Sequence, residues 1–229
     1  MERVGEIIDL TDEQQHMLEH FVSPDYNSCS TLSPQHLIII LVESLESWAL
    51  EKEITGAHNM PFLRSFIQRD HVLYCDKVTS EARKGNSGDG QMTVVTGLLP
   101  IQNGAACALY GSNTFPNLPH FFPEPYIVNP CLHEWNQDSM TLRYEIKHSI
   151  EPQQTGDWQD REVLEQLTNI MSNVTNPTFA LAITTTSHTP FFTTDIEQFA
   201  PESTKIPVVL RNYLTCLNYT DACIETCVE

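Results

Sequence analysis

The chain has 229 residues, enough for one large α/β domain or two small ones. Its composition, 41% hydrophobic and 18% charged, is typical of a globular protein and argues against disorder. A formal net charge of -18 argues against the basic face of a nucleic-acid binder, so no nucleic-acid partner is expected. The sequence lacks both the ~18–20 apolar residues that span a bilayer and the apolar core of a signal peptide. We therefore expect this chain, as given, to be soluble.

A helix and a turn-rich linker are expected over residues 1–34, ahead of a main domain over residues 35–229. Thr11 can cap the start of this helix, and Gln14, three residues later, completes a capping box. Apolar residues follow at helical spacing. The stretch from residue 23 to residue 34 contains prolines and several serines, which is typical of a linker.

The main domain alternates apolar runs with helical patterns. Continuous runs of leucine and β-branched residues predict strands that are buried on both faces. Strands are expected over residues 37–42, 71–78, 126–128 and 179–184, and helices over residues 61–67, 91–98, 160–171 and within 207–228. This alternation predicts an α/β fold with a mixed but largely parallel sheet between helices.

The seven cysteines include no CxxC pair, so nothing indicates a structural zinc site. Cys216, Cys223 and Cys227 share one face of the last predicted helix, where we expect them to be small core residues. The spacing does not indicate a disulfide, and the odd number leaves at least one thiol unpaired within the chain.

Polar residues follow three of the predicted strands. Glu43 comes directly after the first apolar run, residues 129–137 follow the short strand, and residues 185–188 follow the last strand. Because ligands of parallel α/β sheets bind beyond the carboxyl ends of the strands, these residues predict a site. Glu43 fits either a surface residue that ends the strand or a ligand for a hard cation such as Mg²⁺ or Mn²⁺.

Ser87 lies in a glycine-rich loop, residues 85–90, just before a predicted helix. Glycine lets the backbone approach a substrate closely, and the amides at a helix N-terminus favour an anion. In that setting Ser87 fits a nucleophile whose attack a metal activates. The same residues also fit a plain turn whose Ser and Asp side chains cap the helix.

Two further segments carry polar or aromatic side chains after a strand. Trp135, beside Asn136 and Gln137, fits the wall of a polar pocket or a half-buried anchor. His188 fits a donor to phosphate or a general acid, although a single histidine more often has neither role.

Five motifs along the chain resemble those of one family in their order and spacing. They are LVESLESW at residues 41–48, MPFL at 60–63, NSGDGQM at 86–92 with TGLLP at 96–100, WNQ at 135–137 and TSHTPF at 186–191. The sequence resembles the sulfatase-domain family of the alkaline-phosphatase superfamily, and within it the lipoteichoic-acid-synthase-like phosphoglycerol transferases. The resemblance runs from about Leu10 to the last residue, and it implies an alkaline-phosphatase-like α/β sandwich.

The resemblance also implies roles for individual residues. Glu43 would be a metal ligand, and Ser87, where many relatives have Thr, would be both ligand and nucleophile. Trp135, Gln137 and His188 would contact the substrate head group. The cofactor would be a divalent metal, Mn²⁺ or Mg²⁺, with Ca²⁺ and Zn²⁺ as alternatives. Attack of Ser87 on a lipid- or glycan-linked phosphodiester would give a phospho-enzyme, and transfer to an alcohol or water would follow.

The sequence departs from the family's pattern at several points. It has no C/S-x-P-x-R motif of the kind that matures to formylglycine, which disfavours sulfate-ester hydrolysis, and Gln137 stands where the nearest transferases have Arg. The Asp-His ligand pair that the family supplies is not found after His188, and the chain as given lacks the membrane helices that precede the domain in relatives. The chain is therefore interpreted as the N-terminal portion of a catalytic domain that alone binds metal weakly and turns over little.

Location and rival functions follow from the same resemblance. The intact protein is expected at the extracytoplasmic face of the membrane or in the periplasm, with membrane contact only through segments outside this chain. One rival function is a non-catalytic module that binds a phosphorylated or sulfated glycan through Trp135, Gln137 and His188. Another is a phosphodiesterase or sulfuric ester hydrolase of the same superfamily.

Overall fold

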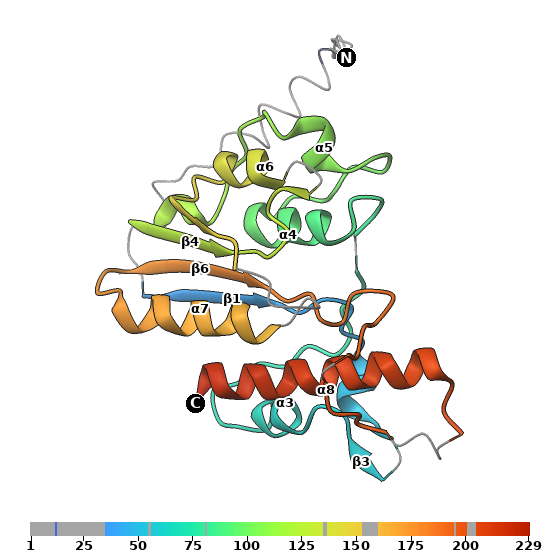
Figure 1. Ribbon diagram of the computed structural model, residues 1–229. Helices are drawn as coiled ribbons and strands as arrows, with labels where there is room; N and C mark the ends of the chain where they lie inside the picture. Colours follow the sequence, from blue (N-terminus) through green and yellow to red (C-terminus); the bar gives the residue numbers. More distant parts are fainter. Residues whose placement is uncertain are drawn as a thin grey trace. The chain divides into compact units, whose positions relative to one another are not determined.

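The computed structural model describes Asp12 and residues 35–54, 56–80, 82–134, 137–152, 160–194, 196–200 and 205–229 (Figure 1). The chain divides into two compact units, Met1–Pro34 and Gln35–Glu229. Asp12 is helical, and the rest of the helix and linker expected over residues 1–34 lies outside the described residues. All further description concerns the second unit.

A parallel sheet forms the centre of this unit. Its four strands lie in the order β1 (Leu37–Leu41), β6 (Thr178–Ile183), β4 (Glu124–Val128) and β5 (His148–Ile150), and every neighbouring pair is parallel. The α/β fold with a mostly parallel sheet, predicted from the alternation of apolar runs and helical patterns, is confirmed. Because the strands are parallel, the carboxyl ends of β1, β6 and β4 meet at one edge of the sheet.

Alternate residues of β6 form the cores on the two faces of the sheet. Phe179, Leu181 and Ile183 face α4 (Asn86–Thr96) and α5 (Ala106–Tyr110), whereas Ala180 and Ala182 face α7 (Asp160–Asn173) and α8 (Val208–Val228). All six residues of β6 are buried, which explains the uninterrupted apolar run. Figure 1 shows α7 along the face opposite to α4.

Smaller elements complete the unit. They are α2 (Ser47–Glu51), the hairpin β2 (Glu53–Ile54) and β3 (Ala57–His58), α3 (Pro61–Phe66), the 3₁₀ turn η2 (Pro119–Phe121) and α6 (Gln137–Arg143). The carboxylate of Asp221 on α8 accepts hydrogen bonds from the Phe62 and Leu63 amides and so caps the start of α3. Together α2, α3 and α8 form a third apolar cluster.

The last helix, α8, forms within residues 207–228, as predicted. On α8, Cys216 and Cys223 are buried and Cys227 is partly buried, as expected for core residues. The cysteines of the described residues are free thiols. None of the described helices is both long enough and apolar enough to cross a membrane.

Two predictions of secondary structure were wrong. Residues 71–78 form no strand: most of them are exposed, and without a partner strand their β propensity has nothing to pack against. The glycine-rich loop expected over residues 85–90 is largely helical, because α4 already begins at Asn86 instead of Gln91. Its buried side chains Met92 and Val95 anchor the helix to the core, and this packing outweighs the weak helix propensity of the glycines.

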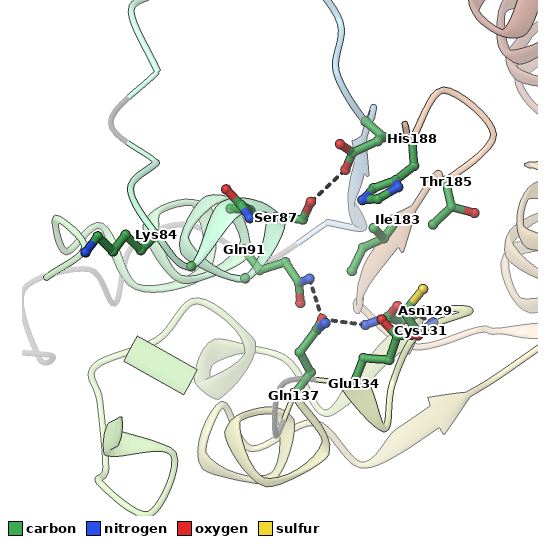
Figure 2. A pocket seen from close by; sticks show the side chains of 14 residues that line it. Lys84, Ser87, Gln91, Asn129, Cys131, Glu134, Gln137, Ile183, Thr185 and His188 are labelled. Carbon is green, nitrogen blue, oxygen red and sulfur yellow. Dashed lines mark hydrogen bonds between the residues drawn. The ribbon is translucent and has the colours of Figure 1, made fainter. Parts of the chain in front are cut away.

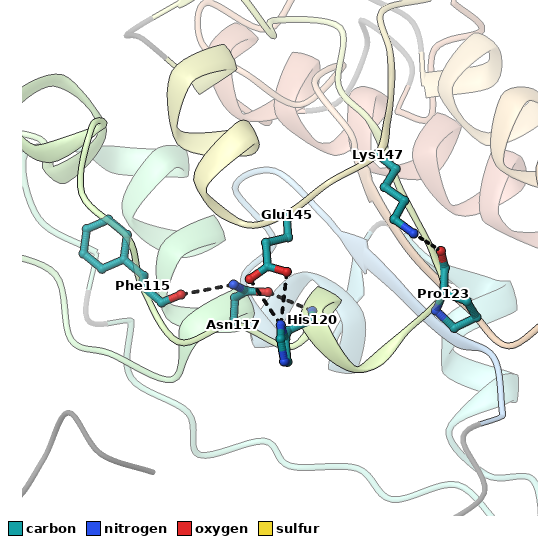
Figure 3. A network of polar contacts seen from close by, with 6 residues as sticks. All are labelled: Phe115, Asn117, His120, Pro123, Glu145 and Lys147. Atoms are coloured by element: carbon teal, nitrogen blue, oxygen red, sulfur yellow. Dashed lines mark hydrogen bonds and ion pairs between the residues drawn. The ribbon is translucent and has the colours of Figure 1, made fainter. Parts of the chain in front are cut away.

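A polar network outside the candidate site ties β5 to β4 (Figure 3). The Nδ1 atom of His120, before β4, lies 3.0 and 3.2 Å from the carboxylate oxygens of Glu145, before β5. Lys147 Nζ donates to the Pro123 carbonyl over 2.6 Å. These contacts join the segments that lead into the two strands. They add to the pairing of β5 with β4, which is short because β5 has only three residues.

Candidate active site

The three strand ends that carry polar residues in the sequence meet at one pocket. Glu43 after β1, Asn129 after β4 and His188 after β6 line a cavity of about 90 Å³, together with Ser87 from α4 and Gln137 from α6 (Figure 2). Of the residues singled out from the sequence, Glu43, Ser87, Gln137 and His188 therefore share one site. Trp135 lies outside the described residues.

The backbone of Glu43 is held on both sides by the segment that follows β6. Its amide donates to Thr184 Oγ1 over 3.0 Å, and its carbonyl accepts from Ser187 Oγ over 2.6 Å. Thr184 and Ser187 are fully buried, so these bonds are shielded from water. The turn that carries Glu43 is thereby fixed to the end of the central strand.

Both carboxylate oxygens of Glu43 accept hydrogen bonds from serine hydroxyls. Ser87 Oγ donates to Oε2 over 2.6 Å, and Ser44 Oγ donates to Oε1 over 2.9 Å. The shorter bond has the length typical of a hydroxyl bonded to a charged carboxylate. Ser87 is the second residue of α4, where the helix dipole adds partial positive charge. The pair joins a potential nucleophile to a potential base at a place that favours an anion.

The loop before Ser87 is shaped by the buried carboxylate of Asp89. Its Oδ2 atom accepts from the amides of Arg83 and Gly85, at 2.9 and 3.0 Å. A Cβ atom on Gly85 would lie 2.1 Å from Asp89 Oδ1, so only glycine fits this close approach. Asp89 therefore turns the chain so that Ser87 enters the pocket.

Three side-chain amides form another wall of the pocket. Gln137 Oε1 accepts from Gln91 Nε2 over 2.7 Å and from Asn129 Nδ2 over 3.0 Å (Figure 2). Asn129 Oδ1 in turn accepts from the Cys131 amide over 2.9 Å. This network joins α4, the end of β4 and α6, and it offers neutral polar groups to a ligand. Gln91 was not singled out from the sequence, because a contact across 46 residues leaves no local pattern.

The charged and titratable groups around the pocket are few. Lys84 and Glu134 line it, as does Cys131. Burial, with the nearby carboxylates of Glu134, Glu151 and Glu43, raises the pKa of Cys131 to about 12. Cys131 is therefore a neutral thiol at physiological pH, which leaves Ser87 as the better-placed nucleophile.

The segment around His188 is anchored through α8. His188 is exposed at the pocket, and its Nδ1 atom lies 2.7 Å from the Thr189 carbonyl. Phe191 packs edge-to-face on Tyr213, with ring centroids 5.3 Å apart, and the Tyr213 hydroxyl donates to the Ser44 carbonyl over 2.8 Å. One buried tyrosine thus links the turn after β1 to the segment after His188.

The donor atoms present suit a hard cation only in part. Glu43 and Ser87 offer a carboxylate and a hydroxyl oxygen on adjacent elements, the ligand type that Mg²⁺ and Mn²⁺ prefer. Nowhere in the described part of the chain do three His, Cys, Asp or Glu side chains gather as a metal-binding group. The two oxygens fit a cation whose further ligands come from other groups.

Comparison with known proteins agrees with this geometry, although no protein-family model matches the sequence. The chain is 22% identical to the lipoteichoic acid synthase-like YvgJ of Bacillus subtilis over 90% of its own length and 35% of that protein. It is also 22% identical to lipoteichoic acid synthase 1 of the same organism, over 95% of its own length and 36% of that protein. These similarities support the resemblance to the lipoteichoic-acid-synthase-like proteins that the sequence motifs indicate. The chain spans about a third of the length of these curated relatives.

Solved structures share the fold of this chain. Lipoteichoic acid synthase LtaP from Listeria monocytogenes matches with a TM-score of 0.74 and 19% identity, over 85% of this chain and 51% of that one. Streptococcus pyogenes phosphoglycerol transferase GacH, in complex with sn-glycerol-1-phosphate, matches with a TM-score of 0.61 and 13% identity, over 86% of this chain and 57% of GacH. The C-terminal periplasmic domain of EcEptC from Escherichia coli, in complex with Zn, matches with a TM-score of 0.56 and 11% identity, over 87% and 60%.

Proposed function

We propose that this chain supplies the nucleophile half of a metal-dependent phosphoryl-ester transferase, with Ser87 as the nucleophile. The observation that carries the proposal is the 2.6 Å hydrogen bond from Ser87 Oγ to Glu43 Oε2 at the carboxyl edge of the parallel sheet. The likeness to two proteins described as lipoteichoic acid synthases supports it.

The reaction that this geometry supports is a double displacement at phosphorus. The Ser87 hydroxyl attacks phosphorus, and the P–O bond to the leaving group breaks. The proton of Ser87 passes by way of the Glu43 carboxylate to solvent, and the departing alkoxide takes up one proton and leaves as an alcohol. The product is a phosphodiester of Ser87. An acceptor hydroxyl then attacks the same phosphorus and releases Ser87, and water in that place would make the enzyme a phosphodiesterase. Amides in the first turn of α4 favour the negative charge that develops on the phosphoryl oxygens.

A divalent cation held by Glu43 and Ser87 fits this scheme, with Mn²⁺ or Mg²⁺ as the leading candidates. When bound, the ion would lower the pKa of the Ser87 hydroxyl and stabilise charge on the phosphoryl oxygens. Divalent cations of this type take six or more ligands, so two oxygens from this chain imply that water, substrate or other protein groups complete the shell. We therefore expect weak metal binding by the chain alone.

The substrate class follows from the neutral wall of the pocket and from the relatives. Gln137, Gln91 and Asn129 offer amides that can bond to the hydroxyls of a glycerol or glycan head group, and His188 can donate to a phosphate oxygen. The glycerol phosphate in the GacH complex supports a lipid- or glycan-linked phosphodiester as the substrate. The periplasmic origin of the E. coli domain supports an extracytoplasmic location for the intact protein.

Trapping the covalent intermediate tests the role of Ser87. The chain would be incubated with bis(p-nitrophenyl) phosphate at millimolar Mn²⁺, with release of p-nitrophenolate and intact protein mass as readouts. We expect a single adduct on Ser87 that EDTA abolishes, that Ser87→Thr retains and that Ser87→Ala lacks. An equal adduct on Ser87→Ala, or none on the wild-type chain, would refute a nucleophilic Ser87.

A metal-free binding module is the second candidate, and the amide wall favours it. Three linked carboxamides are a recognition surface that needs no cation. Saturable binding of sn-glycerol-1-phosphate that is insensitive to EDTA and to Ser87→Ala, but lost in Gln137→Leu, would favour this reading over catalysis.

A further inference from the structure

Asp160 is a buried carboxylate at which three elements of the fold converge. It is the first residue of α7 and has no exposed surface. Its Oδ1 atom accepts from the amides of Thr185 and Thr186, at 2.7 and 2.9 Å, and its Oδ2 atom accepts from Thr220 Oγ1 on α8 at 2.6 Å. The Asp160 amide donates to Thr186 Oγ1 over 2.9 Å. Residues 185–186 are thereby bonded to α7 and, through the Asp160 carboxylate, linked to α8.

The segment that Asp160 holds is the one that shapes the candidate site. Thr184 and Ser187 bond to the backbone of Glu43, while Thr185 and His188 line the pocket. Asp160 itself does not line the pocket and lies on the opposite face of the sheet from α4. Among the described residues, its direct hydrogen bonds to the segment that lines the pocket are those to Thr185 and Thr186.

Burying a carboxylate costs free energy, so the contacts that Asp160 makes must offset that cost. Burial disfavours its charged form, and only good hydrogen bonds offset that cost. Successive amides after a strand point at one acceptor here, and a neutral apolar side chain would leave both amides unsatisfied. We propose that Asp160 is a positioning residue, whose carboxylate fixes residues 184–188 so that Glu43 and His188 face the pocket.

The chain offers a matched control in Asp221. It too is a buried aspartate whose carboxylate accepts two successive amides, those of Phe62 and Leu63, but these belong to α3 and not to the pocket. Replacing either aspartate by alanine removes a similar set of contacts. Only the loss of Asp160 should reach the site.

Amide hydrogen exchange followed by NMR tests the proposal on the whole chain. In the wild-type protein, the Thr185 and Thr186 amides should be protected as strongly as those of β6, although they lie beyond the strand. In Asp160→Ala their exchange should accelerate by about 10- to 100-fold relative to β6, as expected when a charged acceptor of a buried amide is lost. Asp160→Asn, which keeps one carbonyl oxygen, should retain the protection, and Asp221→Ala should leave it unchanged.

Metal binding gives the second readout, and this part of the inference rests on the proposed function. Asp160→Ala should lower the affinity for Mn²⁺ by roughly 10-fold, whereas Asp221→Ala should not change it. If the wild-type chain binds no Mn²⁺, the proposed function fails, while hydrogen exchange still decides the role of Asp160.

Three results would overturn the positioning role. The first is unprotected Thr185 and Thr186 amides in the wild-type chain, a measurement that needs no variant to fold. The second is uniform acceleration across β6 and residues 184–188 in Asp160→Ala, which would indicate a purely global effect. The third is equal loosening of residues 184–188 in Asp221→Ala.

Discussion

Replacing Gly85 by alanine should disrupt the loop that carries Ser87. The added Cβ would lie 2.1, 2.5 and 2.9 Å from Oδ1, Cγ and Oδ2 of the buried Asp89 carboxylate. Unstrained Cβ contacts lie at about 3.4 Å or more, so the carboxylate must move. Asp89 cannot move freely, because its Oδ2 atom holds the amides of Arg83 and Gly85.

The expected cost follows from the two hydrogen bonds at stake. A hydrogen bond to a charged acceptor contributes about 1.5–3 kcal/mol. Because the carboxylate can shift and keep part of each bond, we expect Gly85→Ala to lower the free energy of unfolding by about 2–4 kcal/mol. For a domain of this size, that loss corresponds to a fall in Tm of about 4–16 °C.

Gly90→Ala is the matched control on the same helix. Its Cβ would lie 3.9 Å from Leu41 Cδ2, an ordinary van der Waals contact, and the higher helix propensity of alanine should add about 0.5–1 kcal/mol. Urea denaturation and thermal unfolding by circular dichroism would measure both variants. Equal stability of Gly85→Ala and Gly90→Ala would refute the argument that Asp89 shapes this loop.

Two further predictions concern the ends of β1 and β4. Thr184→Val removes the oxygen that accepts the Glu43 amide and should lower the free energy of unfolding by about 1–3 kcal/mol in urea denaturation. Thr184→Ser keeps the oxygen and loses only a buried methyl group, so it should cost about 1 kcal/mol or less. A loss in Thr184→Ser as large as in Thr184→Val would contradict the role of the hydroxyl. Burial raises the pKa of Cys131 to about 12, so its thiolate fraction at pH 8 is on the order of 10⁻⁴ and rises only as the pH approaches that value. Iodoacetamide at pH 8, followed by peptide mass spectrometry, should therefore label the exposed Cys75 long before Cys131, and labelling of Cys131 at the same rate in the folded protein would show that the thiol is not buried.

The sequence predicts best those parts of the fold whose buried apolar side chains recur at the spacing of a strand or a helix. β6 is a continuous apolar run because it is buried on both faces, and α7 shows its inward stripe Val163, Leu164, Leu167 and Ile170 at helical spacing. The equally apolar run of β1 also predicted burial on both faces, which was wrong, because β1 lies at an edge of the sheet, is only partly buried and exposes Ile38. β5 escapes prediction because it has three residues, two of them exposed, at an edge of the sheet. Its place depends on long-range contacts such as that of His120 with Glu145.

The candidate site likewise contains residues that the sequence predicts and contacts that it does not. Glu43 and His188 can be placed from sequence because they follow apolar strands, and the carboxyl ends of parallel strands meet. The start of α4 was missed because glycines, Asn and Ser dominate residues 85–90, whereas the side chain that stabilises this turn, Asp89, acts through a buried contact that composition does not reveal. The bonds of Gln137 to Gln91 and of Asp160 to Thr185 likewise join distant positions without a local signature.

Calorimetric titration with Mn²⁺ tests the central claim most directly, namely that Glu43 and Ser87 form one metal and nucleophile site. Wild-type chain, Glu43→Ala and Ser87→Ala would be titrated under the same conditions, with Ser44→Ala as a control that removes a neighbouring hydroxyl bonded to the other carboxylate oxygen. We predict weak binding at a single site, lost in Glu43→Ala, reduced in Ser87→Ala and largely kept in Ser44→Ala. Identical titrations for the wild-type chain, Glu43→Ala and Ser87→Ala would contradict the account.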